Sequence, residues 1–146
     1  MSIKEMIREH PDVAGDENES LIEAVKHAMY CAAIANSCAD ACSAEDMDMR
    51  RCIRLCSDTA DVCTMAYRVA SRRTDENRQL IRSVLAVCIE ACETCAEECA
   101  RHDHAHCRRC EQMCRETAED CRQALTELNA EVHADGEIST FAHGAA

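Results

Sequence analysis

Apolar and small side chains recur every three or four positions through most of the chain, which is the period of an amphipathic α-helix. The connecting segments between these stretches are short, so consecutive helices should run antiparallel. We therefore predict an all-α fold, an antiparallel up-down-up-down four-helix bundle preceded by a short N-terminal helix. The four long helices are expected over residues 20–44, 47–72, 74–101 and 104–129.

The two ends of the chain differ from this central part. Residues 1–10 form a short amphipathic segment with Ile3, Met6 and Ile7 on one side. The first long helix has a second apolar side, which we expect this segment or another subunit to cover. The periodicity stops at Asn129, which predicts a loose tail. The expected domains are an N-terminal helix and loop at 1–19, a metal-binding four-helix bundle at 20–129, and a C-terminal tail at 130–146.

Composition changes the picture of the core. The 146 residues include 14 Cys but only one Phe, two Tyr and no Trp, so cysteine takes the place of ordinary core residues. The formal net charge of -12 argues against nucleic acid or an anionic membrane as a partner. The N-terminal segment MSIKEMIREH lacks an apolar signal region, so we expect a cytoplasmic protein. That compartment keeps thiols reduced, which favours metal or redox chemistry over structural disulfides.

The cysteine positions carry the strongest signal. Within each predicted helix, successive cysteines are 3, 4 or 7 residues apart, and such steps return to one face of a helix. One or two buried cysteines are usually small hydrophobic residues, but this many on one seam predict metal ligands. The four sets are Cys31, Cys38 and Cys42; Cys52, Cys56 and Cys63; Cys88, Cys92, Cys95 and Cys99; and Cys107, Cys110, Cys114 and Cys121.

Soft thiolate ligands select Cu(I), zinc or iron–sulfur clusters. Zinc prefers closed tetrahedral sites, and the usual bacterial iron–sulfur run ends in Cys-Pro, whereas the only proline here is Pro11. A continuous line of thiols fits a chain of two- or three-coordinate Cu(I) ions better. One ion per bridging thiolate implies on the order of 14 ions per chain. A zinc or iron–sulfur protein, acting as a metal buffer or a redox protein, remains the alternative.

The two ends of the predicted bundle carry different residues. One end has two loops with thioether and imidazole groups, which are weaker copper ligands suited to metal entrance. The other end continues the cysteine rows with leucine, isoleucine and alanine, which predicts an apolar plug. His27, one turn before Cys31, is expected to be a satisfied core histidine. The predicted entrance residues are Met47, Met49, His102, His104 and His106.

With these motifs in place, residues 20–128 resemble the prokaryotic copper storage proteins, cysteine-rich four-helix bundles. The matching patterns are C-x6-C-x3-C, C-x3-C-x6-C, C-x3-C-x2-C-x3-C and C-x2-C-x3-C-x6-C, in chain order. The resemblance implies Cu(I) storage inside the bundle, His and Met near its open end, a homotetramer, and the cytosolic type. We therefore predict a protein that sequesters many Cu(I) ions for copper homeostasis. No catalytic constellation is evident, so we do not expect an enzyme.

Overall fold

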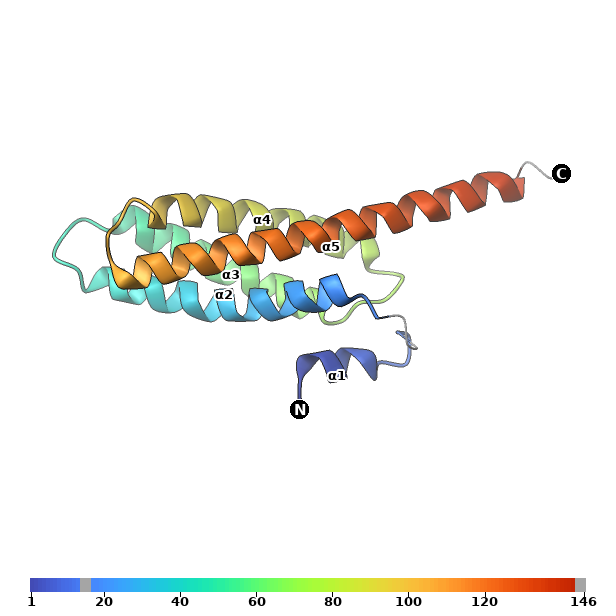
Figure 1. Cartoon of the computed structure of the whole chain (residues 1–146), viewed down its shortest axis with the longest axis horizontal. Coiled ribbons are helices and arrows are strands. Elements are labelled where there is room, and N and C mark those ends of the chain that lie inside the picture. The colour runs from blue at the N-terminus through green and yellow to red at the C-terminus, as the bar shows by residue number, and fades with distance from the viewer. Residues whose placement is uncertain (14–16, 144–146) are drawn as a thin grey trace.

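The computed structural model describes residues 1–13 and 17–143, with side chains up to Gly136, and all regular structure within them is helical. The predicted bundle with a short N-terminal helix is confirmed (Figure 1). None of the helices in these residues combines the length and the apolarity that crossing a bilayer requires. The helices are α1 (Ile3–Arg8), α2 (Glu19–Ser43), α3 (Arg50–Ala70), α4 (Arg78–Cys99) and α5 (Ala105–His143).

The four long helices form a closed ring of neighbours. Helix α2 packs against α3 and α5, and α4 packs against the same two helices. Figure 1 shows the helices side by side, with the α2–α3 and α4–α5 connections at the same end of the bundle. A helix of about 22 residues is about 33 Å long, so the enclosed interior is a long, narrow space between four helix faces.

The start of α4 differs from the predicted boundary by four residues. The side chain of Asn77 accepts a hydrogen bond from the Thr74 N–H at 2.8 Å and donates one to the Arg72 carbonyl at 3.0 Å. These side-chain bonds offer the backbone an alternative to the helical ladder. The helix therefore begins at Arg78, after this turn, and not at Thr74.

The prediction of a loose tail after Asn129 was wrong. Helix α5 does not end at Asn129 but continues to His143, and it projects past the other helices (Figure 1). The extension is tied to the start of α4, since Arg78 pairs with Asp135 at 2.7 Å. None of the side chains from Ala130 to Gly136 is buried, so this stretch lacks the periodicity by which a helix is found in a sequence. Whether residues 130–146 form a separate unit stays a prediction.

The N-terminal helix covers part of the second apolar side of α2, as predicted. A capping box between Ser2 and Glu5 stabilises the start of α1. Helix α1 packs against α2, and its buried Ile7 belongs to the same apolar cluster as Ile22 of α2. Lys4 also forms an ion pair with Glu19 at 2.6 Å. These contacts hold α1 alongside the first turns of the bundle.

The bundle interior has two parts. At the end where α2 and α4 begin, Leu21, Ile81, Leu85 and Leu128 are buried and form the predicted apolar plug. From there to the opposite end, the core is lined by cysteine and alanine. The plug supplies the larger apolar side chains that the thiol-lined part lacks.

Two leucines of α4 test whether this plug stabilises the fold. Leu85 is 1% exposed and Leu80 is 54% exposed. Leu85→Ala should lower the free energy of unfolding by about 2–5 kcal/mol, because it leaves a cavity in the plug. The matched control Leu80→Ala should cost less than about 0.5 kcal/mol. Denaturant unfolding of the reduced protein measures both values, and equal losses in the two variants would contradict the assignment of the plug.

Candidate metal centre

All 14 cysteines lie in the interior of the bundle. None of their side chains is more than 2% exposed, and all are free thiols. Each long helix contributes one row, because the steps of 3, 4 and 7 residues keep the cysteines on the face that turns inward. The spacing of the cysteines in the sequence therefore places their sulfur atoms in a column along the bundle axis.

The sulfur atoms form a nearly continuous series of contacts. Starting from the entrance end, successive Sγ–Sγ distances include 3.6 Å for Cys42–Cys52, 3.6 Å for Cys56–Cys95, 3.7 Å for Cys31–Cys114 and 3.7 Å for Cys63–Cys88. A disulfide needs about 2.05 Å, so these are non-bonded thiols. An ion between two of them could pass to the next pair without leaving the sulfur column.

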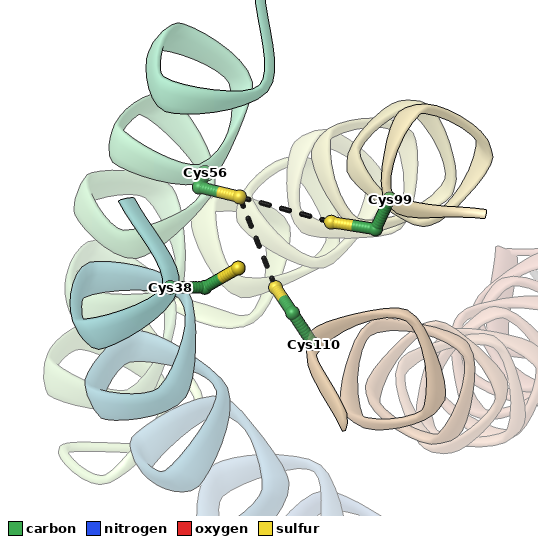
Figure 2. Close-up of side chains that lie close together, drawn as sticks. All are labelled: Cys38, Cys56, Cys99 and Cys110. Atoms are coloured by element: carbon green, nitrogen blue, oxygen red, sulfur yellow. Dashed lines mark hydrogen bonds between the residues drawn. The ribbon is translucent and has the colours of Figure 1, made fainter. Parts of the chain in front are cut away.

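Figure 2 shows one point where all four long helices meet through sulfur. Cys38 of α2, Cys56 of α3, Cys99 of α4 and Cys110 of α5 place their sulfur atoms within 4.8 Å of one another. The Cys56 sulfur lies 3.8 Å from that of Cys99 and 3.9 Å from that of Cys110. Four buried soft donors that converge in this way form a ready site for a soft metal ion.

Further groups of sulfur atoms extend the site in both directions. Each group has ligand atoms within 4.8 Å of one another and draws on at least two helices. The predicted ligands are thus brought together in overlapping sets and not in isolated pairs. These sets are Cys95, Cys110 and Cys114; Cys31, Cys63 and Cys92; and Cys38, Cys42 and Cys107 with His106. Cys121 lies beside Cys88 at the plug end of the column.

The protonation of the thiols follows from burial and from their neighbours. Burial raises the pKa of Cys107 to about 12 and raises the pKa of Cys42 as well. The pKa of Cys38 is lowered, because neighbouring thiols, Cys110 first among them, donate hydrogen bonds to its sulfur. Thiols such as Cys107 and Cys42 therefore keep their protons at neutral pH, and a metal ion must displace those protons to bind.

His106 lies between the sulfur column and the other residues of the predicted entrance. Its Nδ1 lies 3.4 Å from the Cys38 sulfur and 3.5 Å from the Cys107 sulfur. Its Nε2 lies 2.8 Å from a carboxylate oxygen of Glu45. The contact with Cys38, followed by that with Glu45, raises the pKa of His106. Of the three entrance histidines, His106 is therefore the one placed beside thiols.

The other predicted entrance residues lie farther out. The rings of His102, His104 and His106 stack in sequence, with centroids 6.5 and 5.4 Å apart. His104 approaches Glu45 at 3.4 Å. Met47 is 56% exposed, whereas Met49 is 3% exposed and belongs to the core cluster. The structure thus gathers the histidines and Met49 at this end and leaves Met47 in solvent.

Two carboxylates of this end were missed from the sequence. Glu45 contacts both His104 and His106, and the buried Glu98 contacts His102 at 3.1 Å and Arg51 at 2.9 Å. Glu98 precedes Cys99 and looks like a solvent-facing helix residue, so only the fold reveals its role. At the plug end, His27 contacts the Glu23 carbonyl at 3.2 Å and Asp120, as expected for a satisfied histidine.

Comparison with known proteins agrees with this geometry. The sequence model of the copper storage protein family matches residues 17–126. The cysteine-rich protein YhjQ of Bacillus subtilis (strain 168) is 36% identical over 107 residues, which cover 72% of this chain and 93% of that protein. Matches of this extent relate the chain to that family over its whole bundle.

Solved structures of copper storage proteins also match this chain. The copper storage protein Ccsp of Streptomyces lividans, loaded with 10 copper equivalents, is 36% identical, with a TM-score of 0.81, and the match covers 86% of this chain and 98% of that one. A cytosolic copper storage protein of the same organism with five coppers is 38% identical, with a TM-score of 0.72, covering 74% and 93%.

The protonated thiols give a testable dependence on pH. Each Cu(I) that binds a thiol such as Cys107, whose pKa is about 12, should release up to about one proton per thiol ligated. Because protons compete with metal below that pKa, the apparent affinity should fall as pH falls. Proton release can be measured in weakly buffered, anaerobic solution. The same protein with alkylated thiols is the control, and copper uptake without proton release would contradict this account.

Proposed function

This chain belongs to the copper storage protein family, and on that premise we propose that it holds copper as Cu(I) on the thiolates of its core. The single observation that carries the proposal is the column of 14 buried sulfur atoms, 12 of which lie 3.6–4.0 Å from another cysteine sulfur. Thiolate is a soft ligand and favours Cu(I) over harder ions. Each monovalent ion also neutralises one thiolate, which lowers the cost of burying negative charge.

We propose that all of the core cysteines are copper ligands. The role that fits this number of thiolates is the storage of copper in the cytoplasm. The Streptomyces relative described as cytosolic supports this location. Sequestering Cu(I) away from water limits its reactivity, and the family supports storage in place of catalysis. The full set is Cys31, Cys38, Cys42, Cys52, Cys56, Cys63, Cys88, Cys92, Cys95, Cys99, Cys107, Cys110, Cys114 and Cys121.

Copper enters, in this proposal, at the end where the histidines gather. His106 is the innermost of these residues, since it lies 3.4 Å from the Cys38 sulfur. His102 and His104 form the outer part of the entrance, Met49 is a buried residue of the same end, and Met47 is exposed to solvent. The apolar plug closes the other end, so the column fills from the entrance toward the plug.

Zinc is a second candidate for part of the core. Four thiolates around a tetrahedral zinc with Zn–S bonds of about 2.3 Å lie about 3.8 Å apart, and the distances of Cys56 to Cys99 and Cys110 are 3.8 and 3.9 Å. A zinc buffer would bind about one ion per four thiols. Iron–sulfur clusters have no such support from the geometry or the comparisons.

An anaerobic Cu(I) titration against a competing chelator tests the storage role. The reduced protein should bind at least about ten ions per chain, and on the order of 14 if each thiolate accounts for one ion. The double variant Cys56→Ser/Cys110→Ser should lose about two ions or more. The control Ala96→Ser, at a buried position of α4 with no thiol, should keep the full capacity.

Saturation of the unmodified protein at one or two Cu(I) ions would contradict storage. Zinc retention in the presence of excess Cu(I), at about one ion per four thiols, would favour the zinc buffer instead.

We also propose that the chain assembles as a homotetramer through the α2–α3 face. Met29 and Met65 are exposed there, beside a groove lined by small residues that include Ala33 and Ala60. An exposed face of this composition is typical of a protein–protein contact.

Light scattering after gel filtration tests the assembly. The unmodified protein should have about four times the 16.2 kDa mass of one chain. Ala33→Arg should reduce that mass, because a charge enters the contact, while Ala86→Arg on the exposed side of α4 should not. A monomeric unmodified protein would contradict the tetramer.

A further inference from the structure

A pocket opens on the side of the bundle between α2 and α5, close to the entrance end. Its volume is about 330 Å³. Small-molecule sites in proteins have volumes of about 300–1,000 Å³, so this pocket suits a small metabolite and not a macromolecule. The residues that matter for its chemistry are Ser37 and Cys38 of α2 with His106, Arg109 and Met113 of α5.

The pocket reaches the thiol core directly. Cys38 belongs both to the four-sulfur group of Figure 2 and to the group that contains His106. Its exposed fraction is 2%, the largest among the 14 cysteines, most of which are fully buried. Ile34 and Met113 supply apolar walls. A molecule in this pocket therefore lies beside Cys38 at the inner part of the proposed entrance, where His106 also lies.

The pocket is also lined by a cation, the exposed Arg109. Among the residues whose side chains the structure describes, none forms an ion pair or hydrogen bond with the guanidinium of Arg109. Its neighbour Arg108, in contrast, pairs with Asp103. The pocket's carboxylate, Glu116, accepts a hydrogen bond from Gln112 at 2.8 Å and lies seven residues further on, about 10 Å along the helix. The chain has a net charge of -12, so the positive charge of Arg109 is a local feature that attracts an anion to this pocket.

We propose that this pocket is a port at which a small, carboxylate-bearing thiol delivers Cu(I) to Cys38. Arg109 binds a carboxylate of the carrier, and its sulfur, which carries the ion, comes to rest beside the Cys38 sulfur. The inference rests on the proposed function, because it names the source of the stored ion.

The transfer is an exchange of thiol ligands with no change in oxidation state. A bond forms between copper and the Cys38 sulfur, and the bond between copper and the carrier sulfur breaks. Cys38 takes the ion as a thiolate, the form that hydrogen bonds from the neighbouring thiols favour, and the carrier sulfur leaves as a thiolate that then takes a proton from solvent. His106, whose Nδ1 lies 3.4 Å from the Cys38 sulfur, is then the nearest further donor for the arriving ion.

Rates of Cu(I) transfer from different carriers test the recognition of charge. Copper is supplied anaerobically with glutathione, which is anionic, or with 2-mercaptoethanol, which is neutral. Arg109→Gln should slow transfer from glutathione by about fivefold, the factor that one unit-charge contact across water gives. It should leave transfer from 2-mercaptoethanol unchanged. The matched control Arg108→Gln should change neither rate.

Filling the pocket tests the route. Ser37 is exposed on α2 and lines the pocket, so Ser37→Trp places a large ring in the pocket and leaves every cysteine in place. It should slow transfer from both carriers by severalfold with copper capacity unchanged, whereas Ser57→Trp, at an exposed serine of α3, should not. Circular dichroism shows that each variant is folded.

The outcomes separate this inference from the storage role. Full capacity with rates unaffected by either Arg109→Gln or Ser37→Trp would overturn the port and leave storage intact. Equal slowing of both carriers by Arg109→Gln would overturn the recognition of a carboxylate. Failure of the unmodified protein to bind copper would instead overturn the proposed function.

Discussion

Close contact between thiols in a space closed to water is the constraint on which this structure depends. Sulfur atoms 3.6–4.0 Å apart along the bundle axis cannot all lose their protons, because unpaired negative charge is costly in such an interior. Burial accordingly raises the pKa of thiols such as Cys107 and Cys42. Soft monovalent cations avoid this cost of buried negative charge, since each replaces a proton and binds sulfur atoms of neighbouring helices.

The same constraint explains why the two ends of the bundle differ. A core of cysteine and alanine buries little apolar area per residue, so stability has to come from elsewhere. The plug around Ile81 and Leu85, with α1 packed on α2, supplies larger apolar side chains. At the opposite end, imidazoles and carboxylates such as His106 and Glu45 replace them, as the proposed entry of ions at that end requires. The residues that stabilise the fold and the residues proposed to exchange ions with solvent thus lie at opposite ends of the bundle.

The periodicity of the cysteines was sufficient to predict the four inward-facing rows, because the geometry of a helix converts steps of 3, 4 and 7 residues into one face. It was also sufficient to place the histidines at one end, since short connections force antiparallel neighbours. The role of Glu98 could not be predicted, because its contact with Arg51 joins residues that are 47 positions apart in the chain. The helix after Asn129 was missed because none of its side chains up to Gly136 is buried, so no pattern marks this stretch.

The central claim is that copper is held as Cu(I) by core thiolates, and X-ray absorption at the copper edge of the loaded protein tests it most directly. The account predicts an edge typical of Cu(I) and a first shell made of sulfur, with at most a minor contribution of nitrogen from His106. As loading proceeds, copper–copper scattering should grow, because neighbouring thiol groups share members such as Cys110. A Cu(II) edge, or a first shell dominated by nitrogen and oxygen, would contradict the account.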